Sequence, residues 1–141
     1  MKKFLLNFLI FLLIGFVFIF TYSFVESFIL KKENKERIEK KKIRVEVLNG
    51  TKVPKLAQKV TARIRELGFD VIYYGSYDSE INQTCIFDRK YPDLFAGKML
   101  AKEIRNPKVY FEADPDNLVD ITVVIGKDYK KYFPEIEKEW E

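Results

Sequence analysis

The stretch RVEVLNGTKVPKLAQKVTARIRELGFDV, residues 44–71, decides the fold of this chain. Its first residues alternate in polarity up to Leu48 and end in an Asn-Gly pair, which is typical of a strand that enters a tight turn. Pro54 suits the first turn of a helix, because it lacks an amide hydrogen that would have no partner there. We therefore expect a strand over residues 44–50, with a helix directly after it.

Apolar residues then recur at spacings of three and four, which predicts one buried stripe along a helix that ends at Gly68. The stripe consists of Val53, Leu56, Ala57, Val60, Ile64 and Leu67. Residues 69–77, FDVIYYGSY, are rich in β-branched and aromatic side chains. They predict a second strand, broken at Gly75.

Three basic residues, Lys55, Lys59 and Arg63, follow one another at i,i+4 on the other side of this helix. Such a row is ordinarily a solvated face. The alternative is a docking face for an anionic glycan or lipid, and we keep the three residues as candidate binding residues.

Further elements are expected outward from this stretch. Residues 84–88 and 108–114 predict short strands, and residues 91–106 return to helical spacing. Residues 119–126, VDITVVIG, are nearly all β-branched, which indicates a central strand covered on both faces. The order β-α-β-β-α-β-β predicts a small α/β domain (an α+β sandwich) with its helices on one face of a sheet.

An apolar segment precedes the domain. Residues 4–25 carry no charge, and as a helix they would extend roughly 33 Å, enough to cross a hydrocarbon core of about 30 Å. A cleaved signal peptide would have a shorter apolar region that ends in small residues, whereas here the apolar residues continue to Ile29. We expect a single-span anchor over residues 1–30 that contacts membrane lipid.

A charged segment joins the anchor to the domain. Residues 31–43 contain helix formers and neither Pro nor Gly, which predicts a solvated helical stalk or a polybasic site for anionic lipids. Eight Lys or Arg residues lie between Lys31 and Arg44, so the positive-inside rule places the folded domain in the cytoplasm. The expected boundaries are a domain over residues 44–129 and an acidic tail over 130–141.

Charge and composition argue against several classes of function. The net charge of +4 is concentrated beside the apolar segment, because residues 44–141 contain sixteen basic against seventeen acidic residues. A clustered basic footprint for nucleic acid is therefore missing from the domain sequence. The chain has no histidine, and Cys85 is expected to be an inert core thiol. Asp114, Asp116 and Asp120 lack the calcium-loop pattern, so we expect no metal. Because the chain also has no histidine to activate Cys85, we expect no cofactor and no enzymatic activity.

Residues 44–71 resemble the opening of the LytR/CpsA/Psr C-terminal domain family, in which a strand ends in a Val-Leu-Asn-Gly-Thr turn before a proline and a helix. Residues 119–129, VDITVVIGKDY, are similar to the closing strand of that family. The resemblance implies an α/β domain on the outer side of the cytoplasmic membrane, associated with cell-envelope assembly. It also implies that Asn49, Gly50 and Thr51 are landmarks with a binding role. The phosphotransferase domain that often precedes this family is not expected here, since only the stalk separates Arg44 from the apolar segment.

Three functions remain open. The first is a membrane-anchored, non-enzymatic binding module of the cell envelope, linked to cell-wall polymer assembly, with a cell-wall glycan or envelope protein as partner. The second is a structural or scaffolding membrane subunit that recruits other proteins. The third, which follows from the charge count, is a cytoplasm-facing membrane adaptor.

Overall fold

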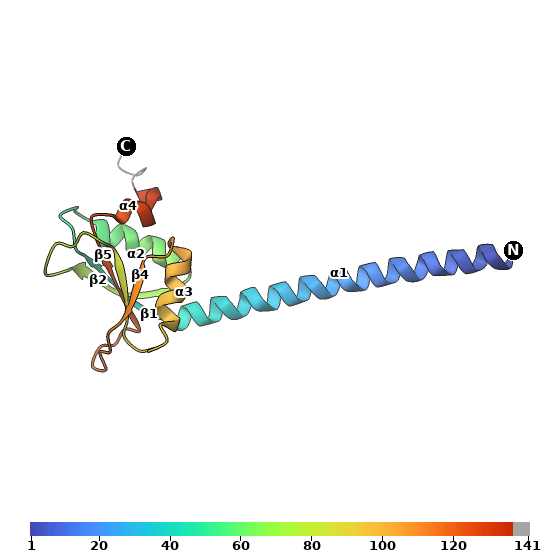
Figure 1. Cartoon of the computed structure of the whole chain (residues 1–141), viewed down its shortest axis with the longest axis horizontal. Coiled ribbons are helices and arrows are strands. Elements are labelled where there is room, and N and C mark those ends of the chain that lie inside the picture. Colours follow the sequence, from blue (N-terminus) through green and yellow to red (C-terminus); the bar gives the residue numbers. More distant parts are fainter. Residues whose placement is uncertain (137–141) are drawn as a thin grey trace. The chain divides into compact units, whose positions relative to one another are not determined.

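The computed structural model describes residues 1–136, except for the side chains of residues 2, 23, 26–28, 30, 33 and 34 in the first helix. The chain divides into two compact units, residues 1–38 and residues 39–141. Figure 1 labels most of the elements. In chain order they are α1 (Lys2–Lys42), β1 (Arg44–Asn49), α2 (Leu56–Glu66), β2 (Asp70–Ser76), β3 (Cys85–Asp88), α3 (Phe95–Glu103), β4 (Lys108–Phe111), β5 (Ile121–Ile125) and α4 (Tyr129–Tyr132).

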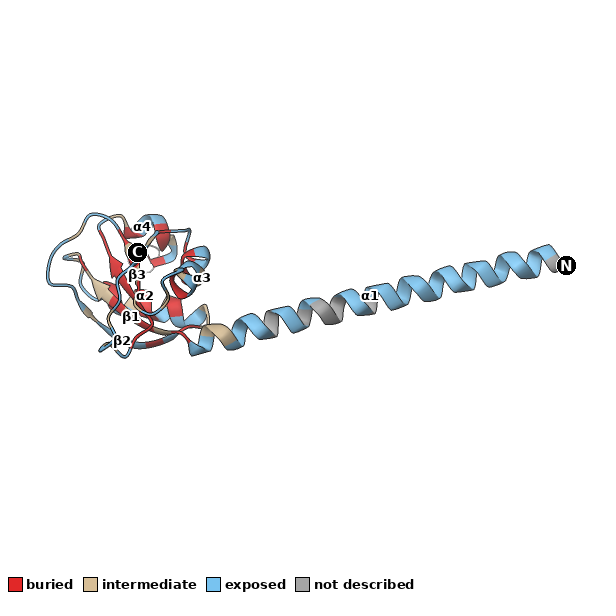
Figure 2. Ribbon diagram, turned by 60° about the horizontal axis from the view of Figure 1, so that its bottom comes forward, coloured by how far each residue is buried: buried red, intermediate tan, exposed pale blue. Residues whose placement is uncertain are grey.

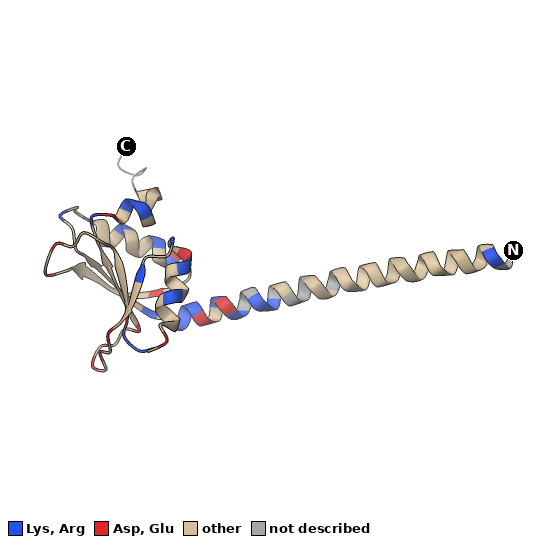
Figure 3. Cartoon of the chain, in the orientation of Figure 1, with Lys and Arg blue, Asp and Glu red and all other residues tan. Residues whose placement is uncertain are grey.

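The first unit is the greater part of α1. Within it, residues Lys3–Tyr22 are apolar almost throughout, and none of them is buried. Figure 2 shows this part of the helix as exposed, and Figure 3 shows no charged residue between the blue residues at the N-terminal end of α1 and the blue and red residues of the stalk. A helix that is apolar all round has no face suited to water. The stretch is long and apolar enough to cross a membrane, a property that it shares with signal sequences.

The second unit is built on a five-stranded mixed sheet in the order β2-β1-β5-β3-β4. β1 pairs in parallel with both β2 and β5, and β3 pairs in parallel with β4. The two halves meet where β3 runs antiparallel to β5. Each half is a strand-helix-strand unit, so the predicted α/β class and the predicted order of elements are confirmed.

The two long helices of this unit pack on one face of the sheet. α2 buries Leu56, Ala57, Val60, Thr61 and Ile64, and α3 buries Ala96, Gly97, Leu100 and Ala101. Apolar side chains of β1, β3 and β5 complete the same core. Four members of the predicted stripe therefore form the buried face of α2, whereas Val53 and Leu67 lie outside the helix and are only partly buried. Among residues 39–136, no helix lies over the other face of the sheet (Figure 1).

α2 ends at Glu66, two residues before the glycine that the sequence predicted as its end. Gly68 has a φ of +95°, and the amide of Phe69 donates to the Ile64 carbonyl at 3.3 Å. This pair of features closes the helix in the left-handed turn that glycine favours. At the other end, α2 begins at Leu56, two residues after Pro54.

Several predicted boundaries were wrong. β2 is not broken at Gly75, which pairs with Leu48 inside the strand. A Cβ placed on Gly75 would lie 2.8 Å from the Tyr73 hydroxyl, so this glycine makes room for a side chain. α3 covers residues 95–103, because Leu94, Arg105 and Asn106 adopt positive φ values at its two ends.

Part of the segment predicted to be an acidic tail belongs to the core. Tyr132, Phe133 and Ile136 are buried against the sheet and helices, and Phe133 has no exposed surface. Burial of three large side chains within seven residues requires that this segment fold with the domain. The domain therefore continues past the predicted boundary at residue 129. The last five residues of the predicted tail, 137–141, lie outside the described residues.

Candidate functional site

The turn after β1 uses its own polar side chains. The Asn49 side-chain amide donates to the Val53 carbonyl at 2.8 Å. Its carbonyl oxygen accepts from both the amide and the hydroxyl of Thr51, at 3.0 and 2.7 Å. The Thr51 hydroxyl also accepts from the Val53 amide at 3.1 Å. A loop of this kind is shaped by side chains that replace backbone partners. The structure thus gives Asn49 and Thr51 a structural role in this loop.

Gly50 has a packing reason to be glycine. A Cβ at this position would lie 2.7 Å from the Ile81 side chain and 2.9 Å from the Ile125 carbonyl oxygen. The amide of Gly50 donates to that same carbonyl, at 2.9 Å. The turn therefore joins the ends of β1 and β5 to the loop that contains Ile81. No residue of the 49–51 turn lines either of the two hollows described below.

The three predicted basic residues do line one surface hollow of about 380 Å³, although Lys55 precedes α2 in a left-handed conformation with a φ of +59°. The residues around it are Lys55, Gln58, Lys59, Ala62, Arg63, Glu66, Glu135 and Ile136. Arg63 is already paired, with Glu66 at 3.1 Å and with Glu135 at 2.7 Å. The hydrogen bond to Glu66, with Glu135 beside it, raises the pKa of Arg63. The three predicted residues are thus together, but two carboxylates offset much of their charge.

A polar network crosses the uncovered face of the sheet. Thr122 donates its hydroxyl to Glu46 at 2.9 Å and accepts from Arg89 at 3.1 Å. Arg89 also pairs with Glu112 at 2.9 Å, and its guanidinium lies 5.2 Å from the centre of the Phe87 ring. These contacts bury Thr122 completely, although no helix covers it. All five residues of β5 are buried, so the expected central strand covered on both faces is found. On the face without a helix, the cover is made by the side chains of this network.

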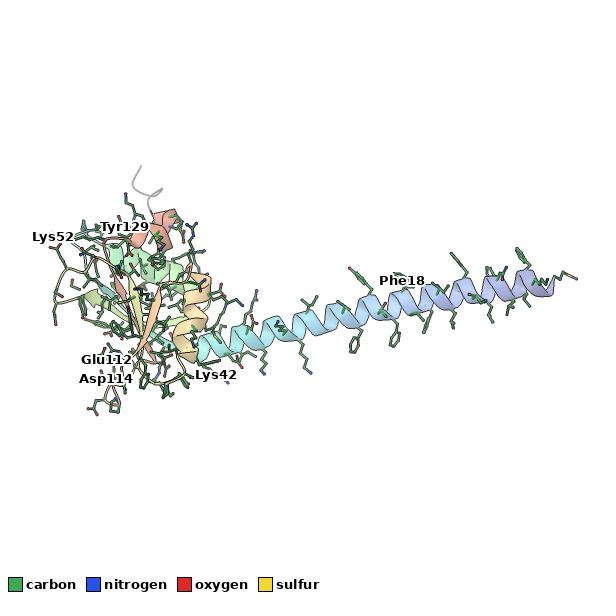
Figure 4. The ribbon with its side chains drawn as sticks, in the orientation of Figure 1. Phe18, Lys42, Lys52, Glu112, Asp114 and Tyr129 are labelled. Atoms are coloured by element: carbon green, nitrogen blue, oxygen red, sulfur yellow. The ribbon has the colours of Figure 1, made fainter. Side chains whose placement is uncertain are left out.

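A second hollow, of about 710 Å³, lies beside this network and was not predicted from the sequence. Its lining is Glu46, Ile72, Tyr73, Asp114, Asp116, Asn117, Leu118 and Val119. Figure 4 labels Asp114 and Glu112 on the loop that leads away from β4. Tyr73 is 55% exposed and Leu118 is 72% exposed, so apolar surface and carboxylates meet here. In the sequence, this hollow is marked only by the pair of aspartates around Pro115.

Asp120, the third aspartate of that segment, has a separate role. Its carboxylate accepts from the Arg44 amide at 2.8 Å and pairs with Lys90 at 3.3 Å. Burial alone would raise the pKa of Asp120, but the hydrogen bonds from Arg44 and Lys90 outweigh burial and hold it below the ordinary 3.8. This residue fixes the start of β1 against the start of β5.

Nucleophile and metal chemistry find little support in the described part of the chain. Cys85 lies in β3 as predicted, but its half-buried side chain is on the uncovered face and outside the helix-facing core. Burial, and then the charge of Asp128, raise the pKa of the Cys85 thiol, which disfavours the reactive thiolate. Within residues 1–136, no three Asp, Glu or Cys side chains are grouped to hold a metal ion.

Solved structures and curated proteins offer little that is similar to this chain. One solved structure resembles it, the soluble domain of a conserved hypothetical secreted protein (Rv2700 ortholog) from Mycobacterium marinum, with 19% identity and a TM-score of 0.46. The likeness covers 63% of this chain and 62% of that one, so this chain spans less than two thirds of that structure. No curated protein matches.

A family model gives the stronger result. The model described as "LytR cell envelope-related transcriptional attenuator" matches residues 42–129, which include both stretches that carried the resemblance and every strand of the sheet. This chain belongs to the LytR C-terminal domain family of cell envelope-related proteins.

Proposed function

We propose that this protein is a membrane-anchored, non-enzymatic binding module of the cell envelope, with its folded domain outside the cytoplasm. The observation that carries the proposal is the joining of an apolar helical stretch with no buried residue, Lys3–Tyr22, to a domain of an envelope-related family. Each large apolar side chain left in water would forgo about 1.5–3 kcal/mol of burial. A lipid bilayer removes that cost for the whole stretch.

Anchoring has a direct consequence for binding. A domain held at a membrane surface meets partners there at a raised effective concentration, so modest contacts suffice. The stalk that follows the span, with Lys31, Lys32 and Lys35 near its start, suits contact with anionic headgroups. The chemistry of the second hollow, carboxylates beside the exposed Tyr73, fits binding better than catalysis.

The partner class within the envelope is part of the same proposal. Cell-wall glycan and envelope protein both fit the family, and the basic hollow of Lys55, Lys59 and Arg63 is the candidate surface for an anionic glycan. Nucleic acid does not fit a domain in which acidic residues slightly outnumber basic ones.

One observation favours a second candidate, a cytoplasm-facing membrane adaptor. The basic residues from Lys31 to Arg44 outnumber Lys2 and Lys3, and the positive-inside rule would keep the more basic side in the cytoplasm. The same anchor would serve, with the domain on the other side.

A pair of reporter fusions after Glu141 decides between the two. Alkaline phosphatase is active only outside the cytoplasm, whereas green fluorescent protein exported by the general secretory route is dark. We expect an active phosphatase fusion and a dark fluorescent fusion. The same fluorescent protein fused before Met1 is the matched control and should be bright. A bright C-terminal fusion with an inactive phosphatase would reject the envelope-facing module in favour of the adaptor.

A further inference from the structure

The outermost strand β2 is an unusually open sheet edge. It has seven residues, and Ile72, Tyr73 and Tyr74 are 46%, 55% and 45% exposed. Natural edges are commonly kept short or protected by lysine and proline. β4, at the opposite edge, follows that pattern with four residues that begin with Lys108. β2 has neither device, which makes it the edge suited to pairing.

The backbone of β2 offers hydrogen-bonding groups at this edge. The amides of Asp70 and Tyr77 donate inward, to the carbonyls of Ile43 and Asn49, at 3.2 and 2.9 Å. Because backbone groups alternate in direction along a strand, those of Tyr74 and Ser76 point to the free side. The Val71 carbonyl, by contrast, is taken by Arg65 at 2.8 Å. The open part of the edge is therefore the second half of β2.

A register shift places Tyr73 on the uncovered face. β1 and β2 are offset between Val45 and Glu46, so that Val45 pairs with Val71 while Glu46 pairs with Tyr73. Irregularities of this kind re-aim side chains. Here the result is that Tyr73 stands beside Glu46 at the mouth of the 710 Å³ hollow.

This hollow is acidic as well as aromatic. Its lining contains three carboxylates, those of Glu46, Asp114 and Asp116, and no basic side chain. Asp114 and Asp116 take part in no ion pair among residues 1–136. A cationic side chain held there would gain from the carboxylates and from the face of the Tyr73 ring. The charge thus specifies a basic occupant.

We infer that β2 receives an extended, basic segment of a partner protein as a sixth strand, with one Lys or Arg side chain in the adjacent hollow. Strand addition takes its affinity from main-chain hydrogen bonds and its specificity from pockets beside the edge. A second copy of this chain is the wrong occupant, because two-fold pairing of β2 would bring two sets of three carboxylates together. The inference rests on the proposed binding role and names the partner class for it.

The test uses the full chain in phosphatidylcholine nanodiscs, which are neutral and do not attract a basic probe. The probe is a fluorescent peptide of alternating threonine and lysine, and the counter-probe has glutamate in place of lysine. We expect saturable binding of the lysine peptide alone, together with slowed amide exchange at Tyr74 and Ser76. Absence of saturable binding, or equal binding of both peptides, would overturn the inference.

Two pairs of variants separate the edge from the charge. Tyr74→Pro removes an outward amide without touching the pairing to β1, and Tyr74→Val is its matched control. Asp114→Asn with Asp116→Asn should weaken binding about three- to tenfold, in line with exposed ion pairs. Asp78→Asn with Asp93→Asn makes the same change of charge outside the hollow and should have no effect. Equal losses in the test and control pairs would reject the site.

A peptide-side variant protects the test against misfolding. N-methylation of alternate peptide residues removes the donors that would face β2 and leaves the protein unchanged. The methylated peptide should lose binding, and retained binding would exclude strand addition. Liposome flotation is measured in parallel, so that loss of peptide binding with intact membrane association rejects the docking edge and not the proposed anchor.

Discussion

Replacement of Phe133 by alanine tests whether the segment after β5 is part of the folded core. Phe133 has no exposed surface and packs within the main apolar cluster. Phe→Ala changes at buried positions cost about 3–5 kcal/mol, through lost burial and the cavity that remains. Domains of this size have total stabilities of about 5–15 kcal/mol. With about 4–8 °C lost per kcal/mol, the melting temperature should fall by roughly 12–40 °C.

The assay is thermal unfolding of the full chain in detergent, followed by near-ultraviolet circular dichroism of its eight tyrosines. This signal reports tertiary packing, whereas the far-ultraviolet signal would also contain α1. Phe111→Ala is the matched control, because Phe111 is 43% exposed in β4 and should lower the melting temperature by only a few degrees. If the two variants melted together, Phe133 would not be a core residue and the domain boundary drawn here would be wrong.

Three further predictions concern the sheet and its loops. Asp120→Asn should lower the unfolding free energy at pH 7 by about 1.5–3 kcal/mol. The native pKa of Asp120 lies below 3.8, so the difference in unfolding free energy between wild type and variant should persist through mild acid. It should vanish only as the pH falls through that native pKa and the wild-type carboxylate becomes protonated. A constant difference down to pH 2 would contradict the ion pair. Gly50→Ala should cost about 1–3 kcal/mol through overpacking against Ile81, while Gly15→Ala, with nothing within 4 Å, should leave the melting temperature unchanged. Cys85 should react with iodoacetamide at pH 8 much more slowly in the folded protein than in urea, and equal rates would show that burial does not raise its pKa.

Much of the fold was predictable because its local signals agree with its tertiary packing. The α2 stripe follows helical spacing, and its buried members pack against β1 and β2. The run from Ile121 to Ile125 is β-branched throughout, which is the composition of a strand buried on both faces. The Asn-Gly turn and Gly68 marked the end of β1 and of α2.

Other features depend on contacts between distant residues. The helix predicted over 91–106 loses its first residues because the buried Asp88 carboxylate accepts the amides of Lys90, Tyr91 and Gly97, at 3.2, 2.8 and 2.9 Å, and so forms the turn before α3. Periodicity also gave no sign that Phe133 is in the core, since the charged residues around it resemble a solvated tail.

The candidate site also combines features that local patterns predict with features that depend on contacts between distant residues. Lys55, Lys59 and Arg63 line one hollow, but i,i+4 spacing on a helix explains only Lys59 and Arg63, because Lys55 precedes α2. No local pattern could show that Arg63 pairs with Glu135, which follows it by more than seventy residues. The acidic hollow was missed because it joins β1 and β2 to the loop before β5, and its Tyr73 depends on a register shift that no local pattern encodes.

Membrane association of the full chain tests the central claim most directly. In flotation with liposomes after an alkaline carbonate wash, the wild-type chain should rise with the lipid. Leu12→Arg with Leu13→Arg places two charges in the span, at about 2.5–3.5 kcal/mol each, and should leave the protein at the bottom of the gradient. Ile38→Arg, in the same helix but outside the span, should float like the wild type. Wild-type protein that stayed at the bottom with an intact N-terminus, or a doubly charged variant that still floated, would contradict the account.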